Sequence, residues 1–227
     1  MTVTAGERGA AFGYDDDRVH ARESVGASLR RRLDGRFPID PFGGDGQLND
    51  LCAPFVSAVV RVDVVYPERI PRSGAALLIA NRGLGIVEPA AITVAVREIA
   101  GRRARVVGAP SLPLIGPVLT KLGAIASRGD DVAAALRAGY LVVAPLTPTW
   151  LRIGAGEPPR ALFGASAGFP VIPVAVSPVG PLGLPVRPWR VAFGEPIELA
   201  AGLGAAEPVG AAELGELTRE AVEALLG

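Results

Sequence analysis

The sequence predicts an α/β protein with a mainly parallel central sheet and helices on both faces. Short apolar runs alternate with segments of helical periodicity along most of the chain. Two of these runs, 75–80 and 141–144, are apolar at every position, which is typical of strands covered on both faces in a parallel sheet. Strand, helix and strand in succession indicate crossover units and helices on both faces of the sheet.

The pattern assigns each element in order. We expect strands at 59–66, 75–80, 105–108, 124–126, 141–144, 171–177 and 189–193. Helices are expected at 17–33, 47–56, 87–100, 114–122, 160–167 and 213–226, with one more that Asp130 or Asp131 caps and that ends before Gly139. We therefore divide the chain into a flexible amino-terminal tail and helix, residues 1–36, and a single α/β domain, residues 37–227.

Composition narrows the classes of function. Lysine plus arginine and aspartate plus glutamate number 23 each, so no bulk charge favours nucleic acid. Cys52 is the only cysteine, so we expect no internal disulfide and no cluster of thiolate ligands for a metal. We also expect neither a metal site nor a cofactor. No apolar run is long enough to cross a bilayer, and the amino terminus lacks a secretory pattern. We expect a cytoplasmic protein. The helix at 17–33 is rich in arginine and could contact acidic lipid headgroups, so peripheral contact with the inner face of the membrane stays open.

Parallel sheets bind ligands beyond the carboxyl ends of their strands. Residues 81–88 follow one buried strand and residues 145–150 follow another, so these two segments form the predicted site.

Two other segments match known motifs in sequence, but the elements expected around them are the wrong ones for those motifs. Residues 164–168 read Gly-x-Ser-x-Gly, but the expected helix precedes them and the strand follows, the reverse of a hydrolase elbow. Gly83 and Gly85 follow a strand, but Glu88 stands where a dinucleotide fingerprint needs its third glycine.

The motifs along the chain resemble those of a known family. They lie, in the family's order, at 40–43, 61–64, 67–71, 76–81, 112–116, 123–125, 136–139 and 170–174. Together they are similar to the lysophospholipid (1-acylglycerol-3-phosphate) acyltransferase family over about residues 38–197. The resemblance implies a glycerolphosphate acyltransferase-like fold for the domain at 37–227. It also implies a site built from an Asn-His-x-Ser-x-x-Asp motif and a Phe-Pro-Glu-Gly-Thr-Arg motif.

Both motifs are degenerate in this chain. Arg82 occupies the position of the catalytic histidine, Leu84 that of the serine and Val87 that of the acid, with Glu88 one residue further on. Arginine stays protonated and cannot act as the general base, and the only histidine of the chain, His20, lies in the amino-terminal tail. The second segment, 144–150, has neither the glutamate nor the glycine of its motif. We therefore assign no catalytic residue.

The resemblance implies a pseudoenzyme that binds an acyl chain or a lysolipid, or that partners an active acyltransferase. Apolar residues within 112–122 would line the acyl groove, and Arg82 would hold a phosphate or carboxylate head. Two alternatives stay open: an active acyltransferase with an unusual site that uses acyl-CoA, and an interaction module without a lipid ligand. The candidate ligand-binding residues are Asn81, Arg82, Glu88, Arg128, Pro145, Thr147 and Trp150.

Overall fold

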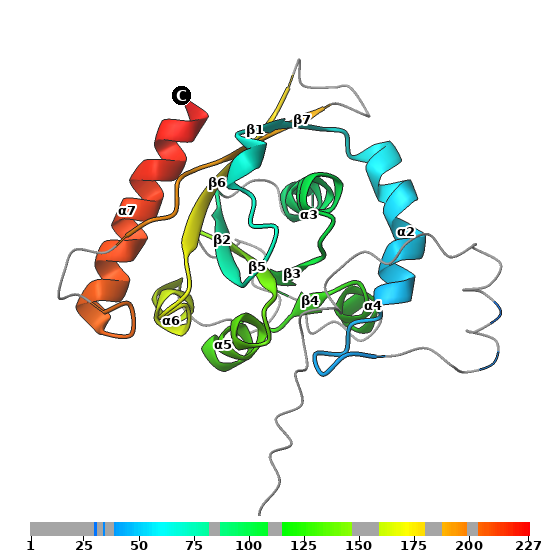
Figure 1. The fold of residues 1–227 in the computed structure, drawn as a ribbon, viewed down its shortest axis with the longest axis horizontal. Coiled ribbons are helices and arrows are strands. Elements are labelled where there is room, and N and C mark those ends of the chain that lie inside the picture. Colours follow the sequence, from blue (N-terminus) through cyan, green and yellow to red (C-terminus); the bar gives the residue numbers. More distant parts are fainter. Residues whose placement is uncertain are drawn as a thin grey trace, which may run out of the picture.

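The structure is a computed structural model that describes residues 39–81, 87–108, 115–146, 159–179, 188–198 and 204–227, together with Arg30 and Asp34. The helix expected at 17–33 lies outside the described residues except for Arg30, which is helical. The arrangement of the described elements is drawn in Figure 1.

Seven strands form one sheet in the order β1-β7-β6-β2-β5-β3-β4. Their bounds are β1 Val62–Val65, β2 Ala76–Ala80, β3 Ala104–Val107, β4 Ala124–Ile125, β5 Leu141–Pro145, β6 Val171–Pro178 and β7 Trp189–Phe193. All neighbouring strands are parallel except β6 and β7, which are antiparallel. The predicted fold class, α/β with a mainly parallel sheet, is confirmed.

Helices cover both faces of this sheet. Their bounds are α2 Gly46–Val59, α3 Val87–Ala100, α4 Ile115–Lys121, α5 Gly129–Arg137, α6 Pro159–Ala165 and α7 Pro208–Leu226, and a 3₁₀ turn, η1, spans Pro67–Arg69. Helix α3 lies over one face, whereas α5, α6 and α7 lie over the other (Figure 1).

The continuous apolar run of β2 is explained by this two-sided cover. Successive side chains of a strand point to opposite faces. Leu78 accordingly joins the core under α3, whereas Leu77 and Ile79 join the core under α5, α6 and α7. All five residues of β2 are buried, so β2 lies at the centre of the fold.

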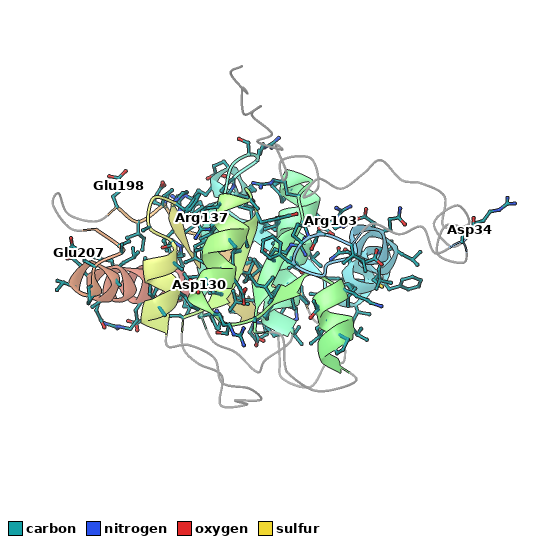
Figure 2. The ribbon with its side chains drawn as sticks, turned by 90° about the horizontal axis from the view of Figure 1, so that it is seen from below. Asp34, Arg103, Asp130, Arg137, Glu198 and Glu207 are labelled. Carbon is teal, nitrogen blue, oxygen red and sulfur yellow. The ribbon has the colours of Figure 1, made fainter. Side chains whose placement is uncertain are left out.

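Ion pairs connect α2 to α3 and to the residue that precedes β3. Asp50 of α2 pairs with Arg103, at 2.6 Å, and with Arg97 of α3, at 2.8 Å. Figure 2 shows Arg103 beside this helix. Just before α2, the buried carboxylate of Asp40 pairs with Arg105 of β3 and also accepts two backbone N–H groups of its own turn. The turn before α2 is thus fixed to β3.

Helix α2 and strand β1 meet at a different residue from the one expected. The strand predicted from Val59 begins at Val62, because Val59 is still the last residue of α2. The N–H of Val60 donates to the C=O of Val56 and closes the last turn of the helix. Three apolar β-branched residues at 56, 59 and 60 gave this segment a strand-like composition, but tertiary contacts override such preferences.

Two helix starts also differ from expectation. Arg128, not Asp130 or Asp131, holds the N-cap position of α5, and its side chain makes no capping bond. Asp130 instead lies in the first turn and Arg137 in the last (Figure 2), each at the end of the helix dipole that its charge favours. Helix α7 begins at Pro208 rather than at residue 213, since proline is well suited to the first helical turn.

Within the part of the chain that the structure describes, no helix is both long enough and apolar enough to cross a membrane.

Candidate functional site

The two predicted site segments begin side by side at the carboxyl edge of the sheet. Strands β2 and β5 are parallel neighbours, and Ala80, the last residue of β2, is paired with Pro145, the last residue of β5. The N–H of Leu146 donates to the C=O of Ala80 over 2.8 Å. The backbone that leads into 81–88 therefore lies directly against the backbone that leads into 146–150.

Asn81 extends the pairing of β2 with β6 beyond the end of the strand. Its backbone N–H donates to the C=O of Val174 over 3.2 Å. Its side-chain amide donates to the C=O of Val176 over 2.8 Å and accepts the N–H of the same residue over 2.6 Å. The carboxamide thus takes the place of a peptide group in the ladder. This structural role is one that the sequence analysis missed.

Glu88 and Val87 face opposite environments at the start of α3. Val87, which the sequence resemblance places at the acid position, is 39% exposed, whereas Glu88 is only 5% exposed. A carboxylate in the first turn is favoured by the positive end of the helix dipole. The structure therefore places the one carboxylate of this segment inside the fold, one residue beyond the motif position, and turns the motif position itself toward solvent.

Arg128 lies at the same edge of the sheet but away from Asn81. It is exposed and follows β4, the last strand of the sheet. Strand β4 is separated from β2 by β5 and β3, so at about 4.8 Å per strand the two strands lie about 14 Å apart. The structure does not bring Arg128 together with Asn81 and Pro145.

Three of the predicted site residues, Arg82, Thr147 and Trp150, lie outside the described residues, as do residues 112–114 of the predicted acyl groove. Among the residues that the structure describes, no group of three His, Cys, Asp or Glu side chains is placed to hold a metal ion. Ser166, from the Gly-x-Ser-x-Gly spelling, is buried after α6 and donates to the C=O of Phe163 over 2.8 Å. Its hydroxyl has a local structural partner rather than the setting of a nucleophile.

The described part of the site has one buried carboxylate, one carboxamide and main-chain groups, but no imidazole. The carboxylate is that of Glu88 at the start of α3, and the carboxamide is that of Asn81, which is bonded to Val176. General acid–base catalysis on a hydroxyl needs a side chain that exchanges a proton near neutral pH, and histidine supplies it most often. The only histidine of the chain, His20, is far from the site segments in the sequence.

Comparison with known proteins gives relatives without an assigned activity. No family model matches the chain. An uncharacterised protein of Mycobacterium tuberculosis (strain H37Rv) is 31% identical, over 89% of this chain and 72% of the relative. Similar proteins come from Mycobacterium bovis, at 31% identity and the same coverage, and from Mycobacterium leprae, at 29% identity over 89% of this chain and 71% of the relative. The chain therefore belongs to the family of these mycobacterial proteins.

Proposed function

We propose that this protein is a degenerate member of the lysophospholipid acyltransferase family that binds an acyl chain or a lysolipid without transferring the acyl group. The observation that supports this most directly is the pairing of Ala80 with Pro145 at the ends of two neighbouring buried strands. In the family that the sequence resembles, both site motifs follow such strands. The adjacency is what two parts of one ligand site require.

The loss of catalysis follows from the residues at the two motifs. Arg82 stands where the family has its base, and a guanidinium cannot accept a proton near neutral pH. Val87 stands at the acid position and is exposed, while Glu88 is buried one residue later. A carboxylate that orients an imidazole has no such role where the imidazole is missing.

Binding needs less from the site than catalysis does. A guanidinium presents a fork of donors that suits a phosphate or carboxylate head, and we assign this part to Arg82. Apolar residues of 112–122 would receive the acyl chain. A protein with this site would hold a lysolipid or fatty acid, or present it to an active acyltransferase.

The experiment combines turnover with equilibrium binding. Purified protein is mixed with acyl-CoA and lysophosphatidic acid, and release of free CoA is followed. We expect no transfer above the uncatalysed rate. Lysophosphatidic acid binding is then measured by isothermal titration for the wild type and for Arg82→Gln, and we expect the variant to bind about tenfold more weakly, or worse, because charged hydrogen bonds are lost.

A matched control and two contrary outcomes make the test decisive. The control variant is Arg72→Gln. Arg72 is exposed and lies between η1 and β2, at the opposite end of β2 from the proposed site. The variant should bind as the wild type does. Turnover of roughly 1 to 10³ per second that vanishes on mutation of Arg82 or Glu88 would identify an active enzyme. If the protein shows no turnover and does not bind the lipid, it is an interaction module without a lipid ligand.

A further inference from the structure

The strand β1 forms an edge of the sheet. It stands at one end of the strand order, and among the described residues β7 is its only strand neighbour. Figure 1 shows it at the upper rim of the molecule, directly after α2. An edge strand presents a row of N–H and C=O groups that can pair with another strand.

The pairing with β7 determines which groups of β1 face outward. The N–H of Trp189 donates to the C=O of Arg61 over 2.7 Å, and Val62 is paired with Trp189. In a parallel ladder the main-chain groups of successive residues alternate in direction. Arg61 and Asp63 therefore bond toward β7, whereas the N–H and C=O groups of Val62 and Val64 point away from the sheet.

The charges beside Val62 favour one partner and one register. Arg61 and Asp63 are both exposed and flank Val62 on either side. In an antiparallel pair of β1 strands with a two-fold axis at Val62, Arg61 lies opposite Asp63 of the partner subunit, and this contact occurs twice. A register centred on Asp63 would instead place two carboxylates opposite each other, which destabilises a pair. The strand is therefore complementary to a second copy of itself.

An exposed apolar stripe lies next to this edge. Phe55 is 73% exposed, Val59 60% and Val56 36%, and they occupy one side of the last turns of α2. No residue of α2 is buried, and Asp50 on this helix forms ion pairs with Arg97 and Arg103. Large side chains grouped in this way on a surface commonly mark an interface. The stripe ends three residues before Val62, so the stripe and the strand edge meet at the junction of α2 and β1.

We propose that this protein forms a two-fold symmetric dimer in which β1 pairs antiparallel with β1 of a second copy. Val62 lies on the axis, Arg61 and Asp63 form two intersubunit ion pairs, and the stripe of Phe55, Val56 and Val59 is covered. The interface is isologous, because each subunit contributes the same surface. It is independent of the proposed lipid site, which lies beyond the ends of β2 and β5.

The test measures mass against concentration. A short strand edge and one apolar stripe make a small interface, so we expect a dissociation constant on the order of 10 µM. Light scattering coupled to size exclusion, and sedimentation equilibrium, should show the mass rising from 23.3 kDa toward twice that value. A mass that stays at that of the monomer up to a protein concentration of about 300 µM would overturn the proposal.

Charge reversal identifies the surface. Asp63→Arg places like charges opposite each other twice and should weaken the dimer by about tenfold or more. Combining it with Arg61→Asp exchanges the two charges and should restore the dimer. The control is Arg72→Asp, an exposed charge outside β1, which should leave the dimer unchanged.

Two further measurements keep the result clear. Circular dichroism shows whether each variant is folded, and Phe55→Ser, which leaves β1 intact, should also weaken the dimer by several-fold. Dimerisation that is unaffected by Asp63→Arg, or that the double exchange fails to restore, would contradict the proposed register. A wild type that stays monomeric but sediments with phosphatidylglycerol vesicles would assign the stripe to a lipid surface instead.

Discussion

Replacing Asn81 with alanine removes the two side-chain bonds that tie the end of β2 to β6. In the wild type the carboxamide satisfies both the N–H and the C=O of Val176, over 2.6 and 2.8 Å. Val176 is buried, so its peptide groups would lose their partners in the variant. Each buried polar group left unpaired costs about 1–3 kcal/mol. Because Asn81 is itself half-buried and admits some water, we expect a total of about 2–4 kcal/mol.

This loss is large enough to measure by thermal or urea unfolding. For a domain of this size it lowers Tm by roughly 4–16 °C. The matched control is Asn49→Ala, which removes a single good bond, from Asn49 Nδ2 to the C=O of Leu122 over 2.8 Å, and should cost about 1 kcal/mol. If Asn81→Ala unfolds within about 0.5 kcal/mol of the wild type, Asn81 is not a structural clamp and its amide is available for a ligand.

Two other substitutions test the fold and the site. Arg105→Leu leaves the buried carboxylate of Asp40 without its cation and should lower the free energy of unfolding by about 3–5 kcal/mol. In urea unfolding, adding Asp40→Asn should recover part of this loss. If the second substitution recovers nothing, the guanidinium of Arg105 acts through packing alone. Arg82→His with Val87→Asp would recreate the spacing of the first acyltransferase motif, but the second segment would keep Pro148, which lacks the backbone donor that the resembled family uses there. We expect this double variant to fold and to remain nearly inactive in an acyl-CoA assay, since a base without a held substrate adds little; robust transfer would show that the acceptor site is intact.

The buried strands could be predicted from the sequence because burial on both faces requires apolar residues at every position. Strands β2 and β5 are covered on both faces, and a run of apolar residues without alternation is what such cover requires. The end of α5 was equally clear, since Gly139 adopts the positive φ, 90°, that glycine accepts at low cost. Because parallel buried strands deliver their following loops to one edge, the adjacency of the ends of β2 and β5, Ala80 and Pro145, could be expected too.

Features that depend on distant partners could not be read in this way. Asp40 sits in a turn-forming sequence, but its ion pair with Arg105 joins residues 65 positions apart. The antiparallel direction of β7 also has no local signal, because a strand has the same pattern in either direction. Asn81 was interpreted as a ligand group since it follows a buried strand, and only the position of β6 beside it reveals its bonds to Val176.

Native mass spectrometry of the protein purified from its own host detects a bound lipid without the need to know its identity. We predict a species heavier than the 23.3 kDa chain by the mass of one fatty acid or lysolipid. We also predict that Arg82→Gln reduces the fraction that carries the lipid, whereas Arg72→Gln does not. A spectrum that shows only the bare chain for the wild type, under conditions that preserve lipid on a known lipid-binding protein, would contradict the proposed lipid binding.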